Sequence, residues 1–274
     1  MTADVTPRKY IFCVSPGRSG SHYLSHVLAG VGDICAVHEP EHQFPAYSAL
    51  RPHLWDLKNR LFLDSFTERR HLKLAQISDL MSRSPSVTYA ETNPLFSTLW
   101  HDVIFDGFSG QDVIVIILRR SAVKVLKSLL DLGWFHSRDG NDWMVTSYSV
   151  NSLTQSLGPE NQATAFHLVI SHILNVEMHA IRIKARCLEL GHKVIELRSD
   201  QLFGDQEAVH TMLTQCGLGV DLSLLHDVKS SIRNKLATRN KQFDFPLETC
   251  AKELDVYLRR CSSSGISVPE SLYI

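Results

Sequence analysis

Residues 9–28, KYIFCVSPGRSGSHYLSHVL, decide the fold of this chain. Residues 10–14 form an apolar run that predicts a buried strand, and a turn rich in serine and glycine follows it. Ser21 then opens a stretch whose apolar residues recur at helical spacing: Tyr23, Leu24, Val27 and Leu28. The sequence therefore predicts a strand, a tight loop and a helix in direct succession.

This loop is suited to binding an anion. Gly17 and Gly20 allow the backbone to turn tightly and to approach a ligand closely. The amides of Gly20, Ser21 and His22 have no acceptor within the helix and point toward whatever lies at its start. Phosphate is the expected ligand, and an ordinary glycine turn without a ligand is the alternative interpretation.

The cation of this loop identifies a family resemblance. The nucleotide-triphosphatase loop GxxxxGK[ST] places a lysine after its second glycine, whereas Arg18 precedes Gly20 here. The segment RSGSHYL resembles the 5′-phosphosulfate loop of the sulfotransferases that use 3′-phosphoadenosine-5′-phosphosulfate (PAPS), with His22 where that family usually has serine or threonine. The resemblance implies that Arg18, Ser19, Gly20, Ser21 and His22 bind the donor.

Length and composition limit the possible classes. The chain has 274 residues, 44% of them hydrophobic and 21% charged, which suits one domain over residues 1–274 with a helical insertion near 46–84 and a C-terminal helical region near 205–274. A net charge of −1 gives no sign of a nucleic-acid or anionic-membrane surface. We therefore expect a small-molecule acceptor as the partner, while the sequence does not indicate an oligomeric state.

The cysteines and the N-terminus bear on the compartment. Six widely scattered cysteines predict free thiols in a reducing environment. No apolar signal segment is visible, and no apolar run approaches the ~20 residues that a membrane helix needs. Animal carbohydrate sulfotransferases usually begin with a Golgi anchor. Because no such segment is visible here, we expect a soluble, cytoplasmic enzyme.

Short apolar segments alternate with longer helical patterns along the chain, which predicts a parallel sheet covered on both faces. The candidate strands are residues 10–14, 34–37, 87–90, 113–118 and 193–197. The expected fold is an α/β, P-loop-like three-layer sandwich with a central parallel sheet of about five strands. Ligands in such folds bind beyond the carboxyl ends of the strands.

The second strand is followed by His38-Glu39-Pro40-Glu41-His42, whose letters match the zinc motif HExxH. Pro40 opposes the helix that would bring both histidines to one metal, so we predict no metal site. Glu39-Pro40 also resembles the Glu-Pro of carbohydrate-type sulfotransferases, where the glutamate is the expected general base. We therefore predict Glu39, with His38 as second choice, as the group that takes the acceptor proton. A solvated polar loop without a catalytic role is the alternative.

The fourth strand, VIVIIL, delivers two arginines to the carboxyl edge of the sheet, and an amphipathic helix follows. The segment from Arg120 through Val125 to Ser128 resembles the family's 3′-phosphate segment, R-x-x-x-x-V-x-x-S. Arginine offers a bidentate fork for phosphate, and a serine two turns along a helix can add a hydroxyl. Arg119 is offset by one position and is the alternative.

Four further features remain open. Glu91 ends the third strand as a second acid or base, or as a hydrogen-bonding group, and Asn93 after it can cap a helix that starts with Pro94. Residues 133–143 form an aromatic stretch that either closes over an acceptor or packs on the core. Residues 160–190 predict one long helix. In the late basic region, Arg233 and Lys235 are candidate donor contacts by resemblance, although the family's R-K-G element is missing.

Together these features predict a PAPS-dependent sulfotransferase that releases PAP, the 3′,5′-bisphosphate of adenosine. Glu39 would take a proton from a hydroxyl or amine of a sugar or secondary metabolite, and Arg18 with the loop amides would stabilise the leaving phosphate. Two rivals stay open: a P-loop small-molecule kinase, which should need magnesium, and a non-catalytic phosphate-binding protein.

Overall fold

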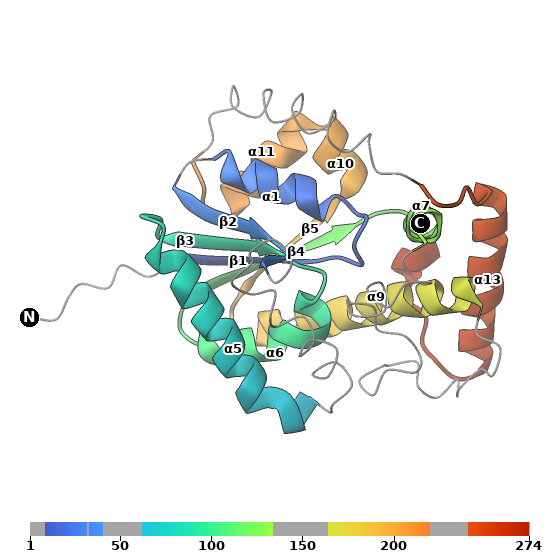
Figure 1. Ribbon diagram of the computed structural model, residues 1–274, viewed down its shortest axis with the longest axis horizontal. Helices are drawn as coiled ribbons and strands as arrows, with labels where there is room; N and C mark the ends of the chain where they lie inside the picture. The colour runs from blue at the N-terminus through green and yellow to red at the C-terminus, as the bar shows by residue number, and fades with distance from the viewer. Residues whose placement is uncertain (1–8, 32, 41–61, 134–163, 220–240, 274) are drawn as a thin grey trace, which may run out of the picture.

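The central sheet has five parallel strands in the order β2-β3-β1-β4-β5. The computed structural model describes residues 9–31, 33–40, 62–133, 164–219 and 241–273. Each strand lies within two residues of its predicted bounds, so the predicted fold class is confirmed (Figure 1). The strands are β1 (Lys9–Val14), β2 (Ile34–His38), β3 (Thr88–Thr92), β4 (Asp112–Arg119) and β5 (Lys193–Arg198).

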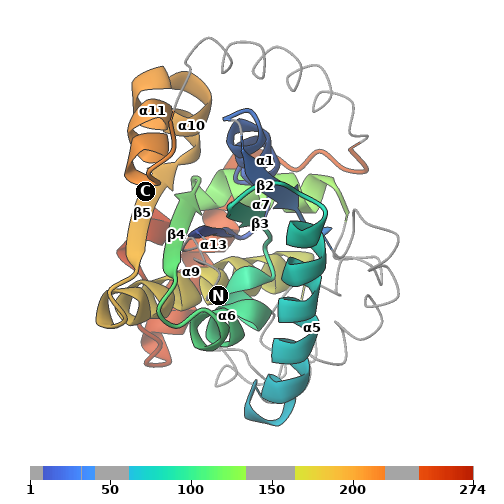
Figure 2. The ribbon, with the colours of Figure 1, turned by 90° about the vertical axis from the view of Figure 1, so that its left-hand side faces the viewer.

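Helices cover both faces of the sheet, as the alternation of strands and helices predicts (Figures 1 and 2). Ile11 and Cys13 of β1 contribute to the core beneath one helical layer, whereas Tyr10 and Phe12 contribute to the core on the opposite face. The first layer holds α1 (Ser21–Ala29), α10 (Ser199–Gly204) and α11 (Gln206–Gln215). The second holds α5 (Phe62–Ser82), the π-helix η1 (Phe96–Trp100), α6 (His101–Gly107) and α9 (Ala165–Glu189).

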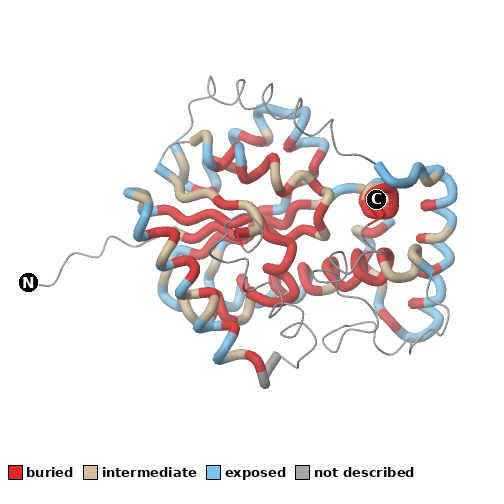
Figure 3. The backbone as a smooth tube through the Cα atoms, viewed as in Figure 1, coloured by how far each residue is buried: buried red, intermediate tan, exposed pale blue. Residues whose placement is uncertain are grey.

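A helical annex lies beyond the carboxyl edge of the sheet. It consists of α7 (Ala122–Asp131), α13 (Leu247–Ser263), the 3-10 helix η4 (Glu270–Tyr273) and the first half of α9, which share a separate apolar core. Figure 3 shows the three central strands β3, β1 and β4 almost entirely buried and the outer face of α13 exposed. The annex places α7, with Ser128, directly beside the loop that follows β1.

Two helix predictions need correction. The long helix predicted from residue 160 begins at Ala165, because the side chain of Thr164 accepts a hydrogen bond from the amide of His167 and caps it there. No α-helix begins at Pro94. Asn93 instead accepts a bond from the amide of Leu95, and a single π-helical turn precedes α6. Of the predicted insertion, α5 is described, and residues 46–61 lie outside the described residues.

All six cysteines are free thiols, and burial raises the pKa of Cys13, Cys187 and Cys216 to about 12, so these thiols are unreactive. In the described part of the chain, no helix combines the length and apolar character needed to cross a membrane.

Candidate active site

The loop between β1 and α1 is held in shape by bonds to its own backbone. The amide of Gly17 donates to Ser15 Oγ at 3.2 Å, and the hydroxyl of Ser19 donates to the Gly17 carbonyl at 3.2 Å. On the far side, His172 Nε2 of α9 lies 3.1 Å from the Pro16 carbonyl oxygen. The carbonyl groups of Pro16 and Gly17 are thus engaged within the protein. The first amides of α1 have no acceptor within the helix and can face a ligand.

Gly20 sets the entry to α1. It has φ +99° and caps the helix without a side-chain hydrogen bond, so no side chain competes for the first amides of the helix. The positive φ favours glycine here, and a Cβ on Gly20 would lie 3.0 Å from ring atoms of Phe203, so a larger residue would also require that ring to shift. The predicted cradle formed by the amides of Gly20, Ser21 and His22 is therefore sterically and electrostatically suited to an anion.

Two arginines converge on this loop. Arg18 Nε donates to Ser128 Oγ at 3.1 Å, across 110 residues of sequence, and Arg120 donates to the carbonyl of Arg18 at 2.7 Å. The structure thus brings the predicted 5′ and 3′ ends of the donor site together beyond the carboxyl ends of the neighbouring strands β1 and β4. Their binding roles stay predictions.

The neighbouring arginine, Arg119, serves the fold. It pairs with Glu177 of α9 at 2.7 Å and with Glu196 of β5. Burial acts to lower the pKa of Arg119, but hydrogen bonds and charges from these carboxylates raise it above its ordinary value. By contrast, burial of part of the guanidinium lowers the pKa of Arg120, although the residue is exposed overall. Among the described residues, no carboxylate forms an ion pair with Arg120, which is the arrangement expected for a cation that receives an anionic ligand.

The end of β2 carries the predicted base. His38 Nδ1 lies 2.8 Å from Thr92 Oγ1 of β3, and His38 Nε2 lies 3.4 Å from Glu39 Oε1. The ring of His22 stacks on that of His38 with centroids 4.8 Å apart. If His38 carries its proton on Nε2, the imidazole faces Glu39 as a donor while Thr92 fixes the ring from the other side. Glu39 and His38 therefore form one unit next to the anion cradle.

Unusual backbone angles occur at two of the predicted catalytic residues, Arg18 and Glu39. Within the described ranges, Arg18 (φ +54°) and Glu39 (φ +44°) are the non-glycine residues with positive φ. Left-handed backbone costs such residues roughly 1–2 kcal/mol, and strain of this kind gathers at functional sites. Both outliers lie at the carboxyl edge of the sheet, where the cradle is.

Glu91 is a structural residue. Its side chain is fully buried and accepts bonds from Lys73 (2.5 Å), Tyr89 (2.6 Å) and Asn93 (2.8 Å). This network fixes α5 to β3 and leaves the carboxylate no access to solvent. Of the two roles left open for Glu91, the structure supports hydrogen bonding.

Several predicted features cannot be placed. His42, most of the aromatic stretch 133–143, Arg233 and Lys235 lie outside the described residues. Across the described ranges, no group of histidine, cysteine, aspartate or glutamate side chains is arranged to hold a metal ion.

The site also contains residues that sequence reasoning missed. Thr92 orients His38, and His172 holds the Pro16 carbonyl. For Thr92 a signal existed, because it ends the strand next to β2 and lies in register with His38. For His172 the sequence offers no signal, since its contact spans 156 residues.

Known structures match this architecture. No protein-family model matches the sequence, and no curated protein matches it. The sulfotransferase domain from the curacin biosynthetic pathway superposes with a TM-score of 0.50 at 13% identity, covering 96% of this chain and 99% of that one. The sulfotransferase domain from the Synechococcus PCC 7002 olefin synthase gives 0.51 at 14% identity, covering 92% and 95%. Mouse sulfotransferase SULT7A1 complexed with PAP gives 0.43 at 13% identity, covering 81% and 64%.

The matches to the curacin-pathway and olefin-synthase domains cover more than nine-tenths of this chain and of each domain. The chain therefore has the sulfotransferase fold, as the loop after β1 predicts. At 13–14% identity the similarity establishes the fold alone, and the reaction is argued from the site.

Proposed function

We propose that this protein transfers the sulfuryl group of PAPS to a hydroxyl or amino group of a small polar acceptor. The observation that carries the proposal is the convergence of three groups at one sheet edge: the start of α1, which no side chain caps, the Arg18–Ser128–Arg120 cluster, and the Glu39–His38 unit. A donor with phosphates at both its 5′ and 3′ positions matches a site with two neighbouring cationic ends.

The cradle and Arg18 serve the 5′ end of the donor. Amides at a helix start stabilise a phosphate, and they stabilise it more as negative charge develops during transfer. Arg18 adds a fixed positive charge beside them. Because arginine stays protonated near neutral pH, its contribution to the departure of the leaving group is electrostatic.

Arg120 and Ser128 serve the 3′-phosphate. Both lie at the start or on the face of α7, and both contact Arg18. Arg120 donates only to a backbone carbonyl among the described residues, so its remaining N–H groups are available for a bidentate contact. Arg233 and Lys235 remain proposed additional contacts.

Glu39 accepts the acceptor proton in this scheme. Its carboxylate is about one-third exposed, and His38 holds it from one side. In-line transfer needs the nucleophile opposite the leaving oxygen. Glu39 follows β2, and one strand, β3, separates β2 from β1 and its cradle. His38 is the second proposed base, because it is anchored by Thr92 in the same unit.

The proposal is tested by isothermal titration calorimetry of purified protein with PAP, 5′-AMP and magnesium-ATP. Micromolar PAP binding with much weaker 5′-AMP binding is expected. Tighter binding of magnesium-ATP than of PAP would replace the sulfotransferase proposal with the kinase.

Catalysis is tested by PAP release from PAPS with a panel of sugars, amines and phenols. Glu39→Gln is expected to bind PAP as the wild type does while losing transfer by roughly 10²–10⁴-fold. Chelation of magnesium is expected to leave the rate unchanged, because the loop lacks the lysine and hydroxyl pair of the nucleotide-triphosphatases. Unchanged PAP binding together with no turnover on any acceptor class would favour a non-catalytic binding protein.

A further inference from the structure

Three imidazole rings link the loop after β1 to the predicted base. His22 is the second residue of α1, and its ring stacks on that of His38 with centroids 4.8 Å apart and 28° between the ring planes. Its Nε2 atom lies 3.1 Å from Nε2 of His26, about one turn further along the helix. His38 Nε2 lies 3.4 Å from Glu39 Oε1. A continuous row of ionisable side chains therefore runs from the exposed His26 to Glu39.

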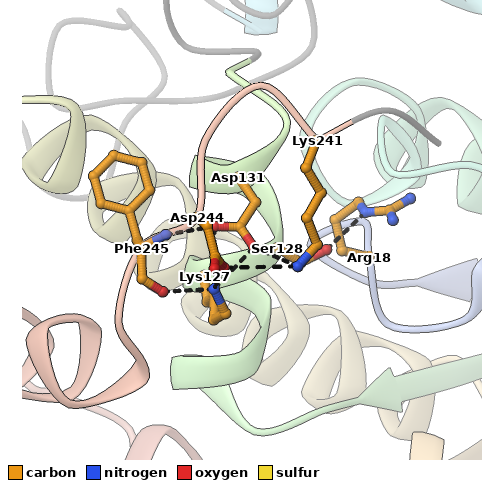
Figure 4. Close-up of polar contacts among 7 residues, drawn as sticks. All are labelled: Arg18, Lys127, Ser128, Asp131, Lys241, Asp244 and Phe245. Atoms are coloured by element: carbon orange, nitrogen blue, oxygen red, sulfur yellow. Dashed lines mark hydrogen bonds and ion pairs between the residues drawn. The ribbon is translucent and has the colours of Figure 1, made fainter.

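This row lies on the base side of the cradle. In the loop before α1, Arg18 donates to Ser128 of α7, the helix that follows β4 (Figure 4). His22 instead contacts His38 at the end of β2. Because β2 and β4 lie on opposite sides of β1 in the sheet, the loop reaches the predicted 3′-phosphate residues through Arg18 and the predicted base through His22.

The row cannot hold a positive charge on every ring. The facing Nε2 atoms of His22 and His26 share one proton, since one nitrogen must donate and the other accept. If both rings were cationic, two N–H groups would face each other. The stacked rings of His22 and His38 are also close enough for two positive charges to repel each other. A proton that charges His22 therefore disfavours a charge on either neighbour.

The helix dipole of α1 acts differently on the two histidines of the helix. His22 is in the first turn, where the positive end of the dipole disfavours a cation, and His26 is in the last turn, where the negative end favours one. A phosphosulfate anion at the cradle brings negative charge to the first turn and reverses this order. The proton then crosses between the rings: the Nε2–H bond of His26 breaks as the Nε2–H bond of His22 forms. His26 is exposed and takes its proton from solvent.

Glu39 competes for the proton at the other end of the row. Its carboxylate favours a charged His38, because an opposite charge at this distance stabilises the imidazolium. The outcome between His22 and His38 therefore depends on whether an anion lies at the cradle. The other groups that β3 and α10 bring near α1 and His38 are uncharged or compensated: Thr92, Glu91 paired with Lys73, and Phe203.

We propose that His22 is a positioning residue for the base: when a donor anion occupies the cradle, His22 takes the proton of the histidine pair and keeps His38 neutral. A cation in contact with a carboxylate lowers its affinity for a proton. Moving the charge from His38 to His22 therefore makes Glu39 a stronger base once the donor is bound. This inference rests on the proposed function, and it gives a reason for the imidazole at position 22, where the resembling family usually has serine or threonine.

The first test follows the imidazole signals by nuclear magnetic resonance from pH 5 to 9, with and without PAP. The chain has 14 histidines, so the three signals are assigned with His22→Ser, His26→Gln and His38→Gln. PAP is expected to raise the apparent pKa of His22 by about one unit, which corresponds to tenfold tighter binding by the protonated form. The apparent pKa of His38 should fall. No change in the titration of His22 on PAP binding would overturn the inference.

The second test is calorimetric titration with PAP at pH 6 and pH 8. Because PAP raises the pKa of His22, the added affinity is present below the pKa of the free protein and is lost as the pH rises through the pKa of the complex. The phosphates of PAP also titrate near pH ~6, so the ratio of the two affinities is compared between proteins. The ratio should be up to about tenfold larger in the wild type than in His22→Ser.

Two substitutions at one position separate charge from packing. His22→Ser keeps the loop amide and removes the ring, whereas His22→Phe keeps a ring against His38 without a titrating nitrogen. Both should lose the added affinity at pH 6, and His38 should titrate at higher pH in their PAP complexes than in that of the wild type. If His22→Phe behaves as the wild type does, the ring acts by packing alone and the inference is overturned. His210→Gln removes an exposed histidine of α11 and should change neither readout.

The outcomes separate the two proposals. If the wild type shows no preference for PAP over 5′-AMP, the proposed function fails and this inference fails with it. If that preference is present but His22→Ser keeps the full affinity ratio between pH 6 and pH 8, only the role of His22 is overturned.

Discussion

Two charged clusters of this molecule differ in how their cations are compensated. Between α5 and the core, Lys73 is 1% exposed and pairs with the fully buried Glu91, and Arg69 pairs with Asp102 at 2.7 Å. At the carboxyl edge of the sheet, Arg120 donates instead to the backbone carbonyl of Arg18. The first cluster satisfies its charges within the fold, whereas the second leaves an arginine with only a neutral partner among the described residues.

The difference separates structural from functional charge. A cation that has no opposite charge within the fold and lies at a ligand-accessible edge is available to bind an anionic ligand, so we expect the protein to use it. Arg119 and Arg120 make the point within two residues: carboxylates raise the pKa of the first, and burial lowers that of the second. Each prediction below perturbs one side of this comparison.

The largest effect is expected from the buried pair. Glu91→Gln removes the negative charge opposite Lys73 and places an amide where Tyr89 and Asn93 now donate. Breaking such a pair costs about 3–5 kcal/mol. Urea denaturation should show a loss of this size, and PAP affinity of the folded protein should be unchanged.

A double variant checks that interpretation. Lys73→Met with Glu91→Gln removes both charges, and stability should recover substantially because the buried ammonium is also gone. A double variant no more stable than Glu91→Gln alone would show that hydrogen bonds to Glu91, and not the ion pair, dominate the network.

The second effect concerns the two adjacent arginines. Arg120→Ala is expected to weaken PAP binding about 100-fold, equivalent to roughly 2.7 kcal/mol, with little change in stability. Arg119→Ala should lower the stability with little change in PAP binding, because it leaves Glu177 and Glu196 without their shared cation. Calorimetry and denaturation of both variants measure the contrast. Equal losses of PAP affinity would contradict the assignment of separate roles.

The sequence predicts the sheet and the location of the site because both depend on local signals. Apolar runs define strands, and the carboxyl ends of parallel strands share an edge, so the sequence alone predicts that Arg18, Glu39 and Arg120 lie near one another. The ion pair between Asp131, at the end of α7, and Lys241 could not be predicted. It joins residues 110 positions apart through a buried charge whose partner no periodic pattern specifies. The π-helical turn at Phe96–Trp100 was missed for a similar reason, since its extra residue per turn leaves no signature in apolar spacing.

The third effect concerns a buried histidine beside the structural cluster, which must gain a proton when the pH is lowered. Burial lowers the pKa of His101 in the folded state, with the charge of Asp102 acting in the opposite direction. Below pH ~6.5 the unfolded chain binds a proton that the folded chain resists, so stability is present above this pH and falls as the pH drops through it. The expected slope is at most about 1.4 kcal/mol per pH unit for each such group.

Denaturation at pH 7.5, 6.5 and 5.5 measures that slope. His192, whose pKa burial also lowers, is expected to contribute in the same direction. His101→Gln should flatten the profile by removing one titrating group. A variant with the same slope as the wild type would assign the acid sensitivity to other residues.

The smallest effect tests whether the backbone is strained at the site. Glu39 has φ +44°, which costs a residue with a Cβ roughly 1–2 kcal/mol. Glu39→Gly and Glu39→Ala both remove the carboxylate and differ only in the Cβ. Transfer should be lost in both, yet the glycine variant should be more stable than the alanine variant by up to about 1 kcal/mol, since the greater freedom of unfolded glycine offsets part of the relief. Ala29→Gly, at an exposed helical position, is the matched control, and there glycine should destabilise the protein.

If Glu39→Ala proves at least as stable as Glu39→Gly, the strand end is relaxed and the fold does not hold the base under strain. If the predicted order is found, the edge of the sheet accepts a stability cost at the residue that the proposed reaction requires, in contrast to the compensated charges around Lys73.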